Sequence, residues 1–104
     1  MPSEARVTTG NDVTFMATDY IDAAYEWFHN SAFIFNRPDK YSGEFTSKLT
    51  VMNAQESDEG NYRCNIILGG ASAQPTAQLF VCKHCMTLFI YSQPLTYIHF
   101  IKNN

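Results

Sequence analysis

Short stretches in which apolar and polar residues alternate recur along the first 81 residues, and turn-forming sequences separate them. Clear examples are residues 13–17, 47–51 and 61–67. A period of two residues places alternate side chains on opposite faces of a strand. No stretch in this part keeps the spacing of an amphipathic helix over three turns. The pattern predicts an all-β fold, either a sandwich or a small barrel of short strands.

The composition is that of one ordinary domain. A chain of 104 residues has the length of a single domain, and a hydrophobic content of 45% is too high for a disordered chain. The formal net charge of −3 does not suggest a nucleic-acid partner. The sequence holds no catalytic triad spacing and no glycine-rich phosphate loop. It therefore predicts a protein that is not an enzyme, with no cofactor and no small-molecule substrate.

The charge distribution changes after Val81. Residues 1–81 carry all ten acidic residues, whereas residues 82–104 carry two lysines and are mainly apolar. The change predicts a domain over residues 1–81 and a C-terminal tail over residues 82–104. The favoured interpretation of the tail is disordered sequence past a truncation point. A short membrane-associating piece and an added strand are the alternatives. A membrane-spanning helix is not expected, because the apolar run is too short and Gln93-Pro94 and His99 interrupt it.

One segment carries a family resemblance. Asp58-Glu59-Gly60-Asn61-Tyr62-Arg63-Cys64 resembles the D-x-G-x-Y-x-C signature of immunoglobulin domains. Upstream, residues 13–17, Trp27-Phe28 and Leu49-Thr50-Val51 are similar to strands B, C and E of that family. The resemblance covers roughly residues 5–81 and implies an immunoglobulin-like β-sandwich of two antiparallel sheets with Greek-key connections. It implies a structural core that includes Ala17, Trp27, Leu49, Tyr62 and Cys64.

The sequence departs from the family pattern at Ala17, which stands where the first cysteine of the inter-sheet disulfide is expected. The resemblance then implies that Cys64 is a buried free thiol. Only 47 positions separate Ala17 from Cys64, too few for the extra ribbon of a variable-type domain, so the I-set type or a related constant-like type fits best. The family pattern also implies an ion pair of Asp58 with Lys40, or alternatively with Arg37, across the base of the sandwich.

Cys82-Lys83-His84-Cys85 forms a C-x-x-C motif. Plain thiols are the favoured interpretation, and a disulfide within or between chains is the first alternative. A zinc site using His84 or His99, or a redox role, is the least favoured, because a second pair of ligands is absent from the sequence. We therefore expect no metal site.

The outward face of the predicted G-F-C sheet is the candidate binding surface. If Trp27, Cys64 and Leu79 point inward, alternation turns their neighbours outward. The outward set is Glu26, Phe28, Arg63, Asn65, Ile67, Gln78 and Phe80. Phe28 and Phe80 should then flank Arg63 and Asn65, and aromatic residues and Arg are enriched at interface hot spots. The alternative is that these aromatics cover the sheet within a longer chain.

The resemblance implies a non-enzymatic binding module for adhesion or recognition. Its partner would be a protein: another copy of itself, paired homophilically, or a neighbouring domain of a longer chain. Such a protein would be extracellular or at the cell surface, although the N-terminus shows no signal peptide. One alternative is a structural domain of an intracellular muscle protein of the titin or twitchin kind, cytoplasmic or sarcomeric. A second alternative is a metal-binding or redox role of the C-x-x-C motif.

Overall fold

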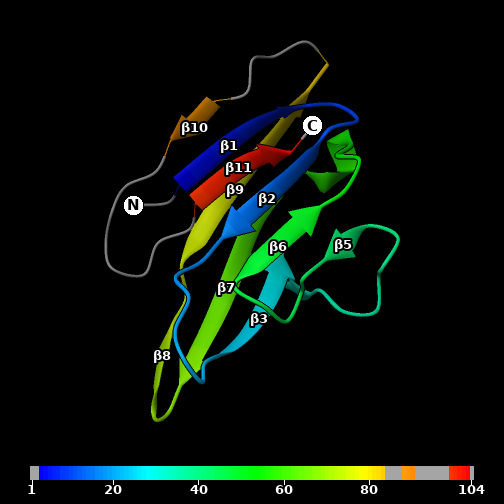
Figure 1. Cartoon of the computed structure of the whole chain (residues 1–104). Coiled ribbons are helices and arrows are strands. Elements are labelled where there is room, and N and C mark those ends of the chain that lie inside the picture. The colour runs from blue at the N-terminus through cyan, green and yellow to red at the C-terminus, as the bar shows by residue number, and fades with distance from the viewer. Residues whose placement is uncertain (1–2, 84–87, 91–98, 104) are drawn as a thin grey trace.

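Two β-sheets pack face to face in the computed structural model, which describes residues 3–83, 88–90 and 99–103 (Figure 1). Side chains are described from Glu4 to Lys83. The first sheet has the order β10 (Leu88–Ile90), β1 (Ser3–Thr8), β9 (Thr76–Cys82), β7 (Gly60–Leu68), β3 (Ala24–His29), β4 (Ala32–Phe33), and β8 (Ala71–Ala73) pairs with β7. The second has the order β11 (His99–Asn103), β2 (Asp12–Met16), β6 (Lys48–Val51), β5 (Tyr41–Ser42). The described residues contain one 3-10 turn, η1 (Glu56–Asp58), and no α-helix, which confirms the predicted all-β sandwich.

Strand boundaries lie within a few residues of those that alternation predicts. The structure adds β1, which runs parallel to β9, and it adds the short strand β8 before the last predicted strand, residues 76–81, which is β9. Pro75 lies between β8 and β9, and its carbonyl accepts a hydrogen bond from the Cys64 amide at 3.0 Å. Proline has no N–H to donate to a sheet, so a strand is commonly interrupted there.

The core lies between the sheets and is built from the alternate residues of each strand. Its centre is aromatic: the Phe15 ring stacks on Tyr62 at 4.7 Å between centroids and lies 6.3 Å from Trp27. The indole N–H of Trp27 donates to the Thr46 carbonyl at 2.8 Å, so this buried polar atom has a partner. The most completely buried large side chains are Trp27, Tyr62, Phe15, Leu49, Ile66, Leu79, Val7, Val13, Val51 and Cys64.

The D-x-G-x-Y-x-C segment forms a corner that enters β7. The Tyr62 hydroxyl donates to the Asp58 carbonyl at 2.6 Å, which ties the strand to the 3-10 turn before it. Gly60 has a φ of +134°, a conformation that residues with a Cβ rarely adopt. A Cβ at this position would also lie 2.3 Å from the Asn30 side chain, which accepts a hydrogen bond from the Asn61 amide. The glycine of the motif is therefore required by backbone conformation and by space.

Two segments of the tail are strands. β10 pairs antiparallel with β1, and β11 pairs antiparallel with β2, so each sheet gains an edge strand from residues after Cys82. For these residues the observation agrees with the added-strand alternative rather than with disorder. The division of the chain at Val81 into domain and tail remains a prediction. Gln93-Pro94, the interrupting pair of the predicted tail, lies outside the described residues.

The described part of the chain holds no helix that is long and apolar enough to cross a membrane.

Cys82 is disulfide-bonded, so the interpretation as a plain thiol is wrong for this residue. An oxidised cysteine offers no thiolate to a metal ion. The other motif residues, His84 and Cys85, lie outside the described residues.

Candidate protein-binding surface

The outward face of β3 and β7 carries the first half of the predicted surface. Phe28 pairs with Arg63 across the two strands, and Glu26 pairs with Asn65. The Arg63 guanidinium lies over the Phe28 ring at 4.5 Å from its centroid, a cation–π contact. Their chain neighbours Trp27 and Cys64 are paired with each other and fully buried, so alternation orients the two faces as the sequence predicts.

Phe80 does not flank Arg63, and this part of the prediction is wrong. β7 and β9 pair with Gly60 opposite Leu79, a register that places Thr76 beside Arg63. Phe80 lies four residues further along β9, and its ring is covered by the Arg6 guanidinium at 4.8 Å. Inward and outward orientation follow from alternation alone, whereas neighbours across strands depend on register, which alternation does not fix.

An exposed aromatic cluster extends from Phe28 around the β4 edge of the first sheet. Phe33 pairs with Phe28, and the centroid of its ring lies 5.4 Å from Phe28, 5.3 Å from Phe35 and 6.2 Å from Phe45. The exposed fractions of the three outer residues are large: 41% for Phe33, 56% for Phe35 and 58% for Phe45. We call Phe28, Phe33, Phe35, Phe45 and Arg63 the aromatic cluster. Exposed phenyl rings gathered in this way are typical of interaction surfaces.

The sequence pattern does not predict the three outer members of this cluster. A signal for two of them was available, because Phe33 and Phe35 alternate around Ile34, which is buried at 4% exposure. Phe45 gives no comparable signal: it belongs to the segment between β5 and β6, and only the fold brings it to Phe33.

Two polar atoms on β7 lack partners. Arg63 Nε and Asn65 Oδ1 are buried and make no hydrogen bond among the described residues. A buried polar atom without a partner typically costs about 1–3 kcal/mol. The fold therefore carries this cost at Arg63 Nε and Asn65 Oδ1, which are buried within the chain and not open to a partner.

The charges on the first sheet are balanced in sign. Glu4 and Arg6 form an ion pair at 4.0 Å on β1, and Glu26 and Arg63 lie on β3 and β7. A surface with equal numbers of positive and negative groups does not repel a copy of itself.

Lys40 and Asp58 form a largely buried ion pair at the base of the sandwich. Lys40 Nζ donates to Asp58 Oδ2 at 2.8 Å, and the two side chains are only 17% and 8% exposed. Lys40 also donates to the carbonyls of Met52 and Asn53, and the same Asp58 oxygen accepts the Gln55 amide. Every contact here ties loops together. The alternative partner Arg37 lies instead 3.7 Å from Asp39.

Cys64 is a free cysteine, fully buried. Burial raises the pKa of its thiol to about 12, so the nucleophilic thiolate is scarce at neutral pH. Burial also raises the pKa values of Tyr41 and Tyr62. Ala17, the position expected to hold a partner cysteine in this family, is 7% exposed just after β2. Within the described residues no three His, Cys, Asp or Glu side chains gather closely enough to hold a metal ion.

No family model and no curated protein matches the chain. Solved structures match its fold. A structure of Tim-1 aligns with a TM-score of 0.66 and 20% identity, covering 83% of this chain and 97% of that one. The titin M4 domain gives 0.65 and 22%, covering 78% and 90%. Extracellular domains 3–5 of Drosophila OTK give 0.64 and 18%, covering 73% of this chain but only 27% of that longer one. Together with the sandwich and the tyrosine corner, these matches show that the chain has the immunoglobulin-like fold.

Proposed function

We propose that this domain is a non-enzymatic protein-binding module whose contact surface is the outward face of the first sheet, centred on the aromatic cluster. The observation that carries the proposal is the set of three phenyl rings that are 41–58% exposed beside Phe28 and Arg63. Burying exposed aromatic area is a main source of binding energy, and Arg beside aromatic rings adds directional contacts.

The partner we propose is a second copy of this chain. A two-fold axis brings the same patch of both copies together, so the patch must complement itself. The aromatic cluster meets this requirement, because Arg63 of one copy can stack on an exposed phenyl ring of the other. The balanced charges of the sheet avoid repulsion between the copies. A standard interface buries about 800 Å² on each partner, a size that one sheet face of a small domain can supply.

We further propose the I-set type and a place in a longer adhesion or recognition protein at the cell surface. A single short strand, β4, follows β3 in the first sheet, and β5 lies at the edge of the second, which supports a compact type. The match to extracellular domains of OTK supports the location. The second candidate is a structural domain of an intracellular muscle protein, and the titin M4 match favours it. In that case the same face would contact a neighbouring domain of the longer chain.

The test is the self-association of the full chain, measured by sedimentation velocity over a range of concentrations. We expect a reversible dimer that Phe33→Ser and Phe35→Ser each weaken. Ile21→Ser is the matched control, because Ile21 is 88% exposed in the loop between β2 and β3, away from the cluster. A chain that stays monomeric at every concentration contradicts homophilic binding. An equal effect of all three substitutions contradicts the location of the contact.

A further inference from the structure

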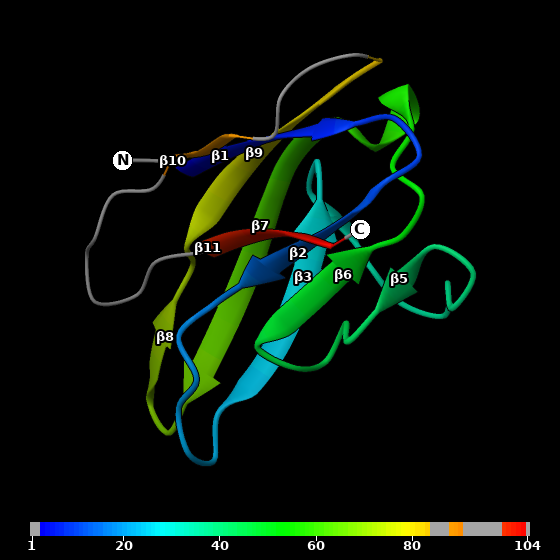
Figure 2. The ribbon, with the colours of Figure 1, turned by 45° about the horizontal axis from the view of Figure 1, so that its top comes forward.

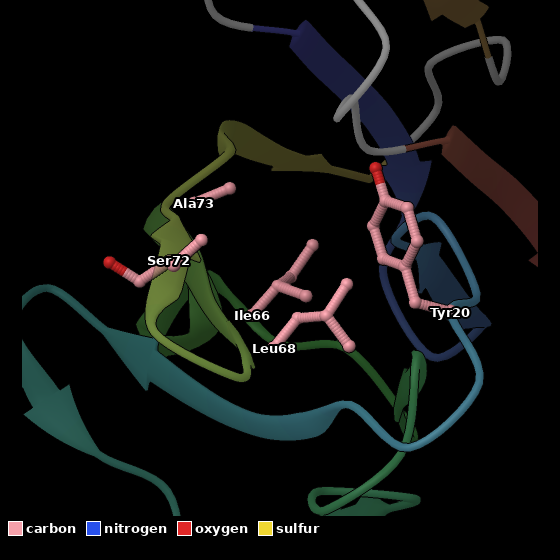
Figure 3. Close-up of a pocket in the computed structure, with 6 residues that line it drawn as sticks. Tyr20, Ile66, Leu68, Ser72 and Ala73 are labelled. Carbon is pink, nitrogen blue, oxygen red and sulfur yellow. The ribbon is translucent and has the colours of Figure 1, made fainter.

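The β7–β8 hairpin and the loop between β2 and β3 lie at the same end of the sandwich (Figure 2). A pocket opens between them (Figure 3). Its volume is about 270 Å³, and it is lined by Tyr20, Ile66, Leu68, Ala71, Ser72 and Ala73. These residues belong neither to the aromatic cluster nor to the Lys40–Asp58 pair. The pocket is therefore a second site, at one end of the sheet whose outward face carries the first.

Strand register gives the pocket an apolar wall. The turn Gly69-Gly70 closes the hairpin, and β7 and β8 pair with Ile66 opposite Ala73 and Leu68 opposite Ala71. These four side chains share one face of the hairpin. Ser72 belongs to the other face, opposite Ile67, and Figure 3 shows its hydroxyl pointing away from the pocket.

Tyr20 forms the facing wall, across from Ile66 and Leu68 (Figure 3). Its loop is held in place: the Tyr20 amide donates to the Tyr25 hydroxyl at 2.7 Å, and that hydroxyl donates to the Thr18 carbonyl at 3.0 Å. The two walls therefore come from elements that hydrogen bonds fix, and the pocket exists before any ligand binds.

The lining selects the chemistry of the ligand. Among the described residues it contains no charged side chain, so these residues offer an ion no counter-charge. A dry apolar cavity of about 150 Å³ holds benzene, so this pocket has room for a bicyclic ring the size of indole. The pocket also keeps apolar surface open to solvent at its mouth, since Leu68 is 37% exposed. A free small molecule would leave this surface uncovered, whereas a polypeptide that inserts one side chain would cover it.

We propose that this pocket binds one uncharged aromatic side chain presented by a protein partner. The inference rests on the proposed role of the domain as a protein-binding module, but it concerns a separate site and does not require self-association. It would make the loop end a second contact region, one that selects a partner by a single anchor residue.

The test uses indole and N-acetyl-tryptophanamide as probes, titrated into the full chain while the amide chemical shifts of the β7–β8 hairpin are followed by NMR. We expect both probes to bind, with shifts that saturate at Leu68, Ala71 and Ala73. For a probe of this size a dissociation constant of about 1 mM is expected.

Ala73→Leu should fill the pocket and weaken binding of both probes at least tenfold. Ile67→Phe is the matched control: Ile67 pairs with Ser72 on the opposite face of the hairpin and does not line the pocket, so enlarging it should leave binding within about twofold of the wild type, a difference of about 0.4 kcal/mol. Ala71→Leu is a second filling variant, for use if Ala73→Leu unfolds the chain.

Absence of saturable shifts at the hairpin with either probe overturns the proposal, because a preformed apolar pocket must admit indole. Binding of indole but not of N-acetyl-tryptophanamide overturns the assignment to a side chain carried on a backbone. Equal binding by Ala73→Leu and Ile67→Phe places the probe elsewhere and has the same consequence. None of these outcomes depends on whether the chain dimerises through the aromatic cluster.

Discussion

The two faces of β7 differ in how completely their side chains are buried and hydrogen-bonded. On the inward face, Tyr62, Cys64 and Ile66 are almost fully buried, and the Tyr62 hydroxyl has a short hydrogen bond. On the outward face, Arg63 Nε and Asn65 Oδ1 have no hydrogen-bond partner among the described residues, and Ile67 is 39% exposed. Residues that alternate along one strand therefore have different roles. The inward set holds the sandwich together, whereas the outward set is less completely buried and lies at the surface.

The largest expected effect on stability is that of Trp27→Ala, compared with the same substitution at its neighbour Phe28. Trp27→Ala should lower the free energy of unfolding by about 3–5 kcal/mol, because it empties the centre of the core. That is a large share of the total stability of a small domain. Urea denaturation measures the change. Phe28→Ala is the comparison on the opposite face and should cost much less. Equal losses for the two variants would remove the distinction between the faces.

Restoring the family disulfide tests the position of Ala17 relative to Cys64. Ala17→Cys should form a bridge to Cys64 and raise the free energy of unfolding by about 2–4 kcal/mol. Peptide mapping detects the bridge, and thermal unfolding with and without reductant measures its effect. Ala17→Ser is the matched control, since it introduces a side chain of similar size that cannot bridge. Failure to form the disulfide under oxidising conditions would show that the Cα atoms of these residues lie too far apart.

The Lys40–Asp58 pair joins loops rather than sheet faces. Breaking it should give the next largest decrease in the free energy of unfolding. Lys40→Met should cost about 1.5–3 kcal/mol, because it leaves the Asp58 carboxylate buried with one fewer charged donor. Thermal and urea unfolding give the value. Arg37→Met is the control, since Arg37 is 58% exposed in its pair with Asp39. Surface pairs contribute about 0–1 kcal/mol, so an equally large loss at Arg37 would contradict the role given to burial.

Tyr62→Phe should cost about 0.5–1.5 kcal/mol, because it removes the hydrogen bond to the Asp58 carbonyl while the ring remains in place. Urea unfolding measures this loss. The stacking of His29 and Phe15 on the ring should persist. A loss as large as that of Trp27→Ala would mean that the hydroxyl, not the ring, secures the corner.

Alternation and one short motif predict much of this fold. They succeed where the structure depends on residues that are close together in the sequence. The D-x-G-x-Y-x-C segment predicts the corner, because Gly60 and Tyr62 act within a few residues of each other. β1 was missed because its parallel pairing with β9 joins opposite ends of the domain. Dependence on contacts between distant segments also limits how well the sequence predicts the candidate binding surface. Alternation turns Phe28, Arg63 and Phe80 outward, yet register separates Phe80 from the other two, and Phe45 reaches the cluster from a distant loop.

The most direct test of the account compares Arg63 with Tyr62, adjacent residues on opposite faces of β7. The measurement is the dimer dissociation constant of Arg63→Met by sedimentation equilibrium, with Tyr62→Phe beside it and melting temperatures recorded for both. We expect Arg63→Met to weaken the dimer at least tenfold, a change of about 1.4 kcal/mol, while its melting temperature stays near that of the wild type. Tyr62→Phe should lower the melting temperature and leave dimerisation unchanged. Wild-type dimerisation by Arg63→Met would contradict the claim that the outward face is the binding surface.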